Sequence, residues 1–174
     1  MATKQTSLLS GRSVNTAAGT PTNVVNDGGR VHTKNGTVAL ATGDLDTGDI
    51  VMLCGVPTGA TILDINLAAD DMDSNATETL AADIGVWKDA LGVTAGDVDV
   101  YTDGSALFEN AVAFGAANFA FVTRVIEKAG QKVFEDAGDA VDPDSEYFIG
   151  ILWVVGAATA VAGDLSFIIT YAVD

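Results

Sequence analysis

Short segments in which apolar and polar residues alternate are the main structural signal in this 174-residue chain. The clearest lies at residues 165–173, with an apolar residue at every second position: Leu165, Phe167, Ile169, Tyr171 and Val173. Because successive side chains of a strand point to opposite faces of a sheet, this spacing predicts a strand with one buried face. Residues 147–155 are almost continuously apolar, which predicts a central strand buried on both faces.

Further β-rich segments are separated by turns that are rich in glycine and aspartate. They predict strands at residues 37–42, 49–56, 61–67, 80–87 and 106–114. Pro57, Thr58 and Gly59 stand between the second and third of these segments and are typical of a tight turn, because proline presets φ at its second position. This turn predicts a hairpin that pairs the two flanking strands.

The other segments of this region are less regular. Residues 90–105 predict a long surface connection, and residues 118–135 predict a short helix that leads into a strand at residues 132–135. About eight short strands with few helices point to an all-β fold, which we expect to be an antiparallel β-sandwich or jelly roll.

Residues 1–35 show neither a helical nor an alternating pattern and consist largely of Ser, Thr, Asn, Ala and Gly. We therefore expect two parts, an extended N-terminal arm at residues 1–35 and a β-sandwich body at residues 36–174. A floppy tail is the simpler alternative, but the arm holds more apolar side chains than a spacer needs, and these could add strand edges to a neighbour. The arm residues that we expect to bind a partner are Lys4, Leu8, Leu9, Arg12, Val24, Val25, Arg30 and Lys34.

Charge is divided unevenly between these two parts. The arm holds four of the eight basic residues and one acidic residue, Asp27, whereas the body holds the other 23 of the 24 acids. A basic arm on an acidic body favours docking of the arm on neighbouring subunits. The formal net charge of −16 disfavours direct binding to nucleic acid and to anionic membranes, whose phosphates attract Lys and Arg. No apolar stretch follows Lys4 as in a secretion signal, so we expect a soluble protein made in a cytoplasm.

The residue types give little support to catalytic or cofactor sites. The single histidine, His32, lies in the arm, where an imidazole is not held rigidly beside a nucleophile, and one histidine excludes the usual histidine-rich metal sites. Cys54 stands in a predicted strand and is interpreted as a small buried hydrophobe, and Trp87 and Trp153 as core residues rather than sugar platforms. We expect no enzyme activity, no cofactor and no small-molecule substrate.

One acidic loop is a weak candidate for a metal site. Three oxygen-bearing residues follow the first positions of a calcium-binding loop: Asp71, Asp73 and Asn75. The sixth position is Ala76 where the turn needs glycine, and the twelfth is Ala82 where a bidentate glutamate is needed, so the loop is not an EF-hand. A looser oxygen site that includes Glu78 stays an alternative to a solvated acidic loop.

Four segments of the body carry a resemblance to a known group of proteins. They are the run from Gly48 to Ile62 (GDIVMLCGVPTGATI), the acidic loop at 70–73, residues 84–86 and the C-terminal segment at 163–171. With these residues the chain resembles the small β-sandwich structural proteins of tailed-bacteriophage virions, over residues 37–90 and 147–173. Residues 91–146 match nothing in that group.

Within that group the chain looks most like a capsid decoration, or cement, protein. The resemblance implies a homotrimer on the outer surface of a capsid, at its local or true three-fold positions, that bridges neighbouring subunits of the major capsid protein. Such proteins often carry extended, interlocked N-terminal arms and offer no catalytic residues to transfer.

Three other readings stay open on the sequence. One is a different virion component, such as a head fibre, a tail adaptor or the head-binding part of a spike. Another is a carbohydrate-binding or host-adhesion jelly roll, which needs exposed aromatic rings or a calcium loop. The last is a hydrolase that uses two carboxylates, for which no specific residues stand out.

Overall fold

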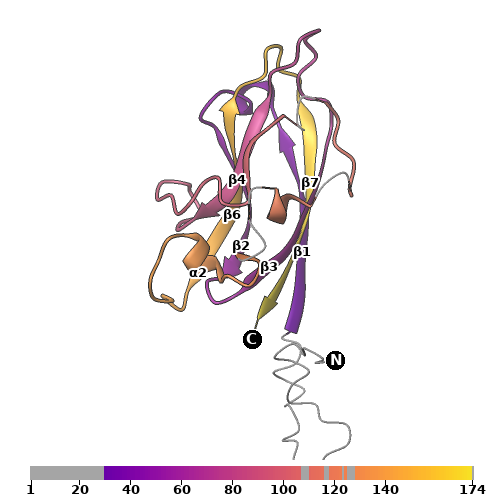
Figure 1. Ribbon diagram of the computed structural model, residues 1–174. Helices are drawn as coiled ribbons and strands as arrows, with labels where there is room; N and C mark the ends of the chain where they lie inside the picture. Colours follow the sequence, from indigo (N-terminus) through magenta and orange to yellow (C-terminus); the bar gives the residue numbers. More distant parts are fainter. Residues whose placement is uncertain (1–29, 107–109, 116–117, 123, 125–127, 174) are drawn as a thin grey trace, which may run out of the picture.

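The structure is a computed structural model that describes residues 30–106, 110–115, 118–122, 124 and 128–173. Its strands form two antiparallel sheets that pack face to face as a β-sandwich (Figure 1). The first sheet has the order β1-β7-β3, with β1 (Arg30–Leu40), β7 (Gly163–Val173) and β3 (Thr61–Ala69). The second has the order β2-β6-β4-β5, with β2 (Ile50–Pro57), β6 (Glu146–Val155), β4 (Ala81–Trp87) and β5 (Thr102–Ser105). The predicted fold class is confirmed.

The order of the strands follows a jelly-roll path. From β1 to β4, consecutive strands alternate between the two sheets, and only β4 and β5 pair as neighbours along the chain. Val112 then pairs with Ala69 of β3 through two backbone hydrogen bonds of 2.8 Å, which places it at the edge of the first sheet. The chain crosses back to the second sheet in β6 and ends in the first in β7, as in a sandwich of two Greek keys.

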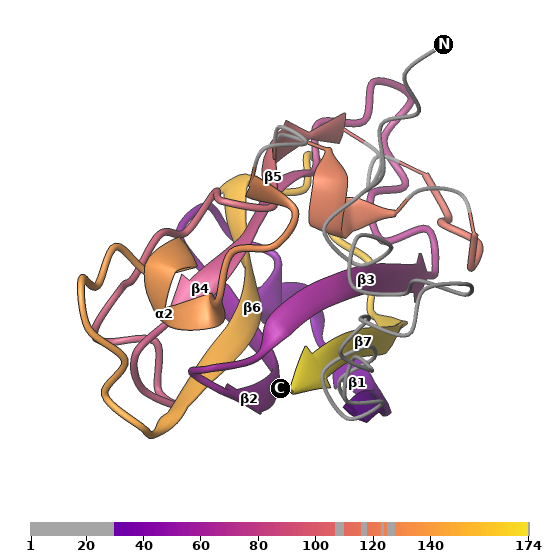
Figure 2. The ribbon, with the colours of Figure 1, turned by 60° about the horizontal axis from the view of Figure 1, so that its bottom comes forward.

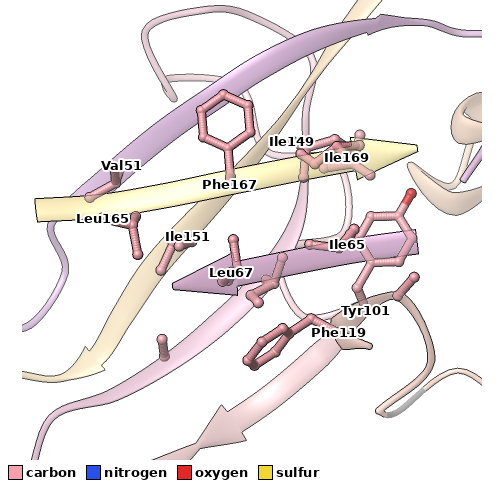
Figure 3. Packing of buried hydrophobic residues seen from close by; sticks show 14 of the residues in the cluster. Val51, Ile65, Leu67, Tyr101, Phe119, Ile149, Ile151, Leu165, Phe167 and Ile169 are labelled. Atoms are coloured by element: carbon pink, nitrogen blue, oxygen red, sulfur yellow. The ribbon is translucent and has the colours of Figure 1, made fainter. Parts of the chain in front are cut away.

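The two sheets face each other (Figure 2), and the buried hydrophobic side chains lie between them (Figure 3). The alternating side chains of β7 that were expected to be buried face this core: Leu165, Phe167, Ile169 and Tyr171. Ile149 and Ile151 of β6 meet them from the opposite sheet (Figure 3). Both tryptophans are buried, with 1% of Trp87 and none of Trp153 exposed. Trp153 lies in the core between the sheets, whereas Trp87 is buried on the outward side of the second sheet, against Gly150. β6 is central to its sheet as predicted, although its outward side chains Phe148 and Leu152 are only half-buried.

The predicted hairpin around Pro57 is wrong. The turn itself is present, with the Ala60 N–H donating to the Pro57 carbonyl oxygen at 3.0 Å. However, β2 pairs with β6 and β3 pairs with β7, so the turn carries the chain from one sheet to the other. Val56 and Ile62, on either side of the turn, are fully buried and cover the core from opposite sheets. Turn residues specify only that the chain reverses its direction. Here the two strands bury their apolar side chains against each other across the core, so they belong to opposite sheets and do not pair.

Two other predicted elements also differ. The strand expected at 132–135 is a single helical turn, α2 (Val133–Asp136), because the Glu135 side chain accepts the Lys132 N–H at 2.8 Å and closes the turn. β5 lies at the end of the segment 90–105 that was expected to be a surface connection. The strand expected at 106–114 falls partly on residues 107–109, outside the described residues, and Val112 makes an isolated pairing. Short 3-10 helices occur at η1 (Thr42–Asp44) and η3 (Phe119–Phe121). Part of the helix expected after residue 118 falls on residues 123 and 125–127, outside the described residues.

The first strand begins at Arg30, so residues 30–35 of the arm belong to the sandwich. They pair with β7, from Arg30 opposite Val173 to Asn35 opposite Ile168. Most of these side chains are exposed, which explains why the sequence shows no alternating pattern there. β1 begins and β7 ends at the same end of the sandwich (Figure 1), where Arg30 pairs with Val173.

The two sheets differ in what covers their outer faces. Segment 94–101 runs back along β4, and the Val86 N–H donates to the Asp97 carbonyl oxygen at 2.8 Å. A Cβ on Gly85 would lie 2.2 Å from the Val98 carbonyl carbon, so this close approach requires glycine. The outer face of the first sheet is instead lined by short side chains, where Thr37 and Ser166 hydrogen-bond at 2.8 Å.

Candidate interaction surface at the open edge of the sandwich

β1 and β2 are the outermost strands of their sheets and contact each other along one side of the sandwich. No strand pairs with the outer edge of either one among the described residues. Their outward backbone N–H and C=O groups therefore form an open edge, which is a recurrent site for the addition of an extended segment. The two ends of this edge are built differently.

Lys34 closes the end where β1 begins. Its ammonium donates to the Gly55 carbonyl oxygen at 2.6 Å and lies 3.5 Å from Glu146 Oε1. Lys34 was expected to bind a partner as part of the arm, and here it links β1 to β2 and β6 of its own chain. Its side chain is 40% exposed and that of Glu146 is 53% exposed, so the ion pair contributes at most about 1 kcal/mol.

Cys54 and His32 lie near this closed end, and both have structural surroundings. Burial raises the pKa of the Cys54 thiol to about 11, and the charges of Lys34 and Glu146 act in opposite directions on it. The thiol therefore stays protonated at neutral pH and is a poor nucleophile. His32 stands in β1, and its ring stacks on Tyr171 with the centroids 5.4 Å apart.

The other end of the edge opens into a groove of about 300 Å³ between β1 and β2. Its lining comes from the end of β1, the start of β2 and the segment between them: Val38, Ala39, Leu40, Asp44, Asp49, Ile50, Val51 and Met52. Leu40 and Val51 are buried in the floor, while at the rim Asp44 is exposed and Asp49 is half-buried. The groove therefore combines an apolar floor, free strand edges and negative charge.

The two rim carboxylates are held in place by local turns. Asp44 Oδ2 accepts the Ala41 N–H at 2.8 Å, and Asp49 Oδ2 accepts the Asp46 N–H at 3.0 Å. Each carboxylate has further lone pairs available, because an ionised carboxylate accepts about four hydrogen bonds. A cationic side chain that enters the groove would meet both oxygen-rich groups at its rim.

An apolar loop borders the groove on the β2 side. The Asp89 carboxylate accepts the N–H groups of Thr94, Leu91 and Val93 at 2.5, 2.9 and 3.2 Å, and these bonds, that of Thr94 above all, lower its pKa. Gly92, at φ +71°, packs so closely on β2 that a Cβ would lie 3.0 Å from Met52 Cε. The loop therefore presents Leu91 and Val93, which are 85% and 81% exposed, beside the groove.

The predicted partner-binding residues fall into two groups. Arg30 and Lys34 lie in β1, toward the end of the strand that is opposite to the groove. The other six lie outside the described residues: Lys4, Leu8, Leu9, Arg12, Val24 and Val25.

The acidic loop considered as a metal site has a structural role at Asp73. This side chain is fully buried, and its carboxylate accepts four backbone N–H groups at 2.8–3.3 Å, from Thr79, Thr159, Ala158 and Asn75. Burial raises its pKa, but the four hydrogen bonds outweigh burial and lower the pKa of Asp73 to about 2. Asp71 accepts the Asp73 N–H at 3.3 Å. Within the described ranges, no three His, Cys, Asp or Glu side chains are grouped to hold a metal ion.

A buried polar network, which the sequence did not indicate, ties the 118–136 region to the second sheet. Arg124 Nη2 donates to Asp136 Oδ1 at 2.8 Å, and both side chains are fully buried. The Tyr101 hydroxyl donates to Asp136 Oδ2 at 2.9 Å. Burial raises the pKa of Asp136 to about 6, although the Arg124 charge and the Tyr101 hydrogen bond lower it. No nucleophile joins this network in the described residues, and its contacts are those of a structural clamp.

A second clamp holds the loops next to α2. Lys88 Nζ donates to Asp139 Oδ1 at 2.6 Å, and the Tyr147 hydroxyl donates to Asp139 Oδ2 at 2.5 Å. These bonds lower the pKa of Asp139, and the bond to Asp139 raises the pKa of Tyr147 to about 12.

None of the helices in the described part of the chain has the length and apolar character that crossing a membrane requires.

No protein-family model matches the chain, and no curated protein does. The structure is similar to a chain of the cyanophage Pam1 capsid asymmetric unit, with a TM-score of 0.57 and 23% identity over 94% of this chain and 97% of that one. It is also similar to a chain of the capsid of Ralstonia phage GP4, with a TM-score of 0.61 and 18% identity over 94% of each chain. The chain therefore has the β-sandwich fold of chains found in the capsids of two phages.

Proposed function

We propose that this chain is a structural protein of a tailed-phage virion, which decorates the capsid and stabilises it by bridging neighbouring subunits of the major capsid protein. The observation that carries the proposal is the match of fold over nearly the full length of chains in two phage capsids. The described residues add an open sheet edge, whose backbone groups can bind a neighbouring chain.

The charge distribution supports a place on the outer surface of the shell. A body with 23 of the chain's 24 acids is repelled by packaged DNA and by other copies of itself. Bridging then depends on contacts that overcome this repulsion, and the arm supplies basic and apolar side chains for them. We infer that the protein acts as a homotrimer in which these arms join the copies and help to hold them on the shell.

Binding to shells tests the proposal directly. Purified full-length protein is mixed with empty, expanded capsids that lack it, and the capsid pellet is assayed after sedimentation. We expect saturable binding at a fixed ratio to the major capsid protein, and shells that resist heat or mechanical disruption better than bare shells. Deleting residues 1–29 should leave a folded body, by circular dichroism, that binds more weakly. Full-length protein that stays in the supernatant at every concentration would contradict a decorating role.

Electron microscopy of the decorated particle separates this role from that of another virion component. Density for the chain over the contacts between capsid subunits supports bridging. Density only at the tail vertex would instead identify an adaptor or a spike-anchoring part.

A further inference from the structure

The groove between β1 and β2 has the properties of a site for an extended peptide. The edges of both strands are unpaired among the described residues, so a segment lying between them could form main-chain hydrogen bonds. Its floor, with Leu40 and Val51, accepts apolar side chains. Its rim, with Asp44 and Asp49, accepts a cation. The matching ligand is a short segment with apolar residues followed closely by a basic one.

The chain contains such a segment in its own arm. Residues 7–12 read Ser-Leu-Leu-Ser-Gly-Arg, with Leu8 and Leu9 apolar and Arg12 basic three residues later. Arg12 is also suited to the two rim carboxylates, because a guanidinium presents several donors in a planar fork. Residues 7–12 lie outside the described residues, so only their residue types identify them as the bound segment.

The reach of the arm permits this docking on another copy. β1 begins at Arg30, and the groove lies at the far end of the same strand. Residues 13–29 can span about 60 Å when extended, whereas β1 is about 36 Å long. The arm can therefore leave its own sandwich and still place residues 7–12 on a neighbour.

Charge favours a neighbouring copy as the owner of the arm. Two acidic bodies repel each other, and a contact between copies is stabilised when a basic group of one lies between carboxylates of the other. Arg12 on Asp44 and Asp49 would provide this neutralisation at the point of contact. We propose that residues 7–12 of one copy dock in the β1–β2 groove of a neighbouring copy, with Leu8 and Leu9 in the groove and Arg12 at the acidic rim. This inference rests on the proposed arm-joined assembly and names its contact.

A disulfide-trapping experiment tests both the site and the neighbour. Two full-length proteins are prepared in a Cys54→Ala background, one with Leu9→Cys and the other with Ala39→Cys, and are mixed in equal amounts and oxidised. Ala39 lines the groove and is exposed. We expect a crosslinked pair containing one chain of each kind, which can form only between copies. The matched control replaces Ala39→Cys with Thr33→Cys, which is exposed on the same strand away from the groove and should crosslink several-fold less.

Two outcomes of the trapping would overturn the inference. One is equal crosslinking of both cysteine positions. The other is a Leu9→Cys/Ala39→Cys double variant that forms only an intrachain bond while the mixed single variants form none.

A charge exchange tests the role of Arg12 without cysteines. Arg12→Glu alone and Asp49→Arg alone should each weaken self-association about fivefold, the upper range for one exposed charge pair, as measured by light scattering across a dilution series. Combining them should restore most of the loss, whereas combining Arg12→Glu with Asp103→Arg, which is exposed on β5 at the far edge of the second sheet from β2, should not. Absence of rescue, or a wild-type chain that is monomeric throughout the series, would overturn the inference. Capsid sedimentation of the same proteins separately shows whether the decorating function holds.

Discussion

Asp73 offers a sharp test of how this fold is held together. One carboxylate accepts backbone N–H groups from its own loop and from the 156–160 turn, which are far apart in sequence. In Asp73→Asn, one oxygen becomes an NH₂ group that points donors at N–H donors. At least two of the four hydrogen bonds are lost, and at about 1–1.5 kcal/mol each we expect a loss of roughly 2–3 kcal/mol of unfolding free energy at pH 7.

The pH dependence of this loss follows from the pKa. The pKa of Asp73 is about 2 in the folded chain, against 3.8 for an ordinary aspartate. Its stabilising contribution is therefore complete above about pH 4 and is lost as the pH falls toward 2, when the native carboxylate takes up a proton. The difference in stability between wild type and Asp73→Asn should shrink over that interval, because the variant has no carboxylate to titrate.

Urea unfolding followed by tryptophan fluorescence, at a series of pH values, measures this difference. Asp71→Asn is the matched control, since Asp71 is exposed in the same loop and accepts a single N–H at 3.3 Å, and we expect its effect to stay within about 0.5 kcal/mol. Equal destabilisation by the two variants, or a difference for Asp73→Asn that is constant down to pH 2, would refute the anchoring role of the Asp73 carboxylate.

Three more outcomes are expected. Asp136→Ala leaves the fully buried Arg124 unpaired and should cost about 3–5 kcal/mol by urea unfolding, whereas replacing both residues with apolar ones should cost less; equal costs would contradict the clamp. Gly85→Ala forces a Cβ to within 2.2 Å of the Val98 carbonyl carbon, so it should lower the melting temperature by several degrees, while alanine at Gly43, which has open space around it, should not. Cys54 should react with a thiol reagent at pH 8 many times more slowly in the folded chain than in urea, because burial raises its pKa to about 11; similar rates would disprove its protection.

Strands with one strongly apolar face could be predicted from the sequence because burial imposes period two on them. β7 is the best example, since each of its core-facing residues was identified. The start of β1 could not, because an edge strand with exposed side chains carries no apolar period. The pairing of β2 and β3 was misjudged, because the turn at Pro57 shows where the chain reverses and not which sheet each strand joins.

The polar anchors were missed for a different reason. Asp73 accepts N–H groups from residues more than 80 positions away, and Tyr101 meets Asp136 across 35 positions. Such contacts depend on the assembled topology, and no local spacing encodes them. The D-x-D-x-N pattern was a signal for a loop whose side chains bind backbone N–H groups, as such short side chains commonly do, but it was read for its calcium ligands.

Lys34 shows what the open end of the sandwich edge lacks. At the closed end, one cation from β1 binds a backbone oxygen of β2 and a carboxylate of β6, and so links the edges of both sheets. At the groove end the same strands again bring carboxylates and free backbone groups together, but the described residues place no cation among those that line it. A basic residue at that position would neutralise the rim and join the two sheet edges, as Lys34 does at the other end. Under the proposed docking, Arg12 of a neighbouring copy supplies this cation, so the chain closes one end of the edge itself and leaves the other end open to assembly.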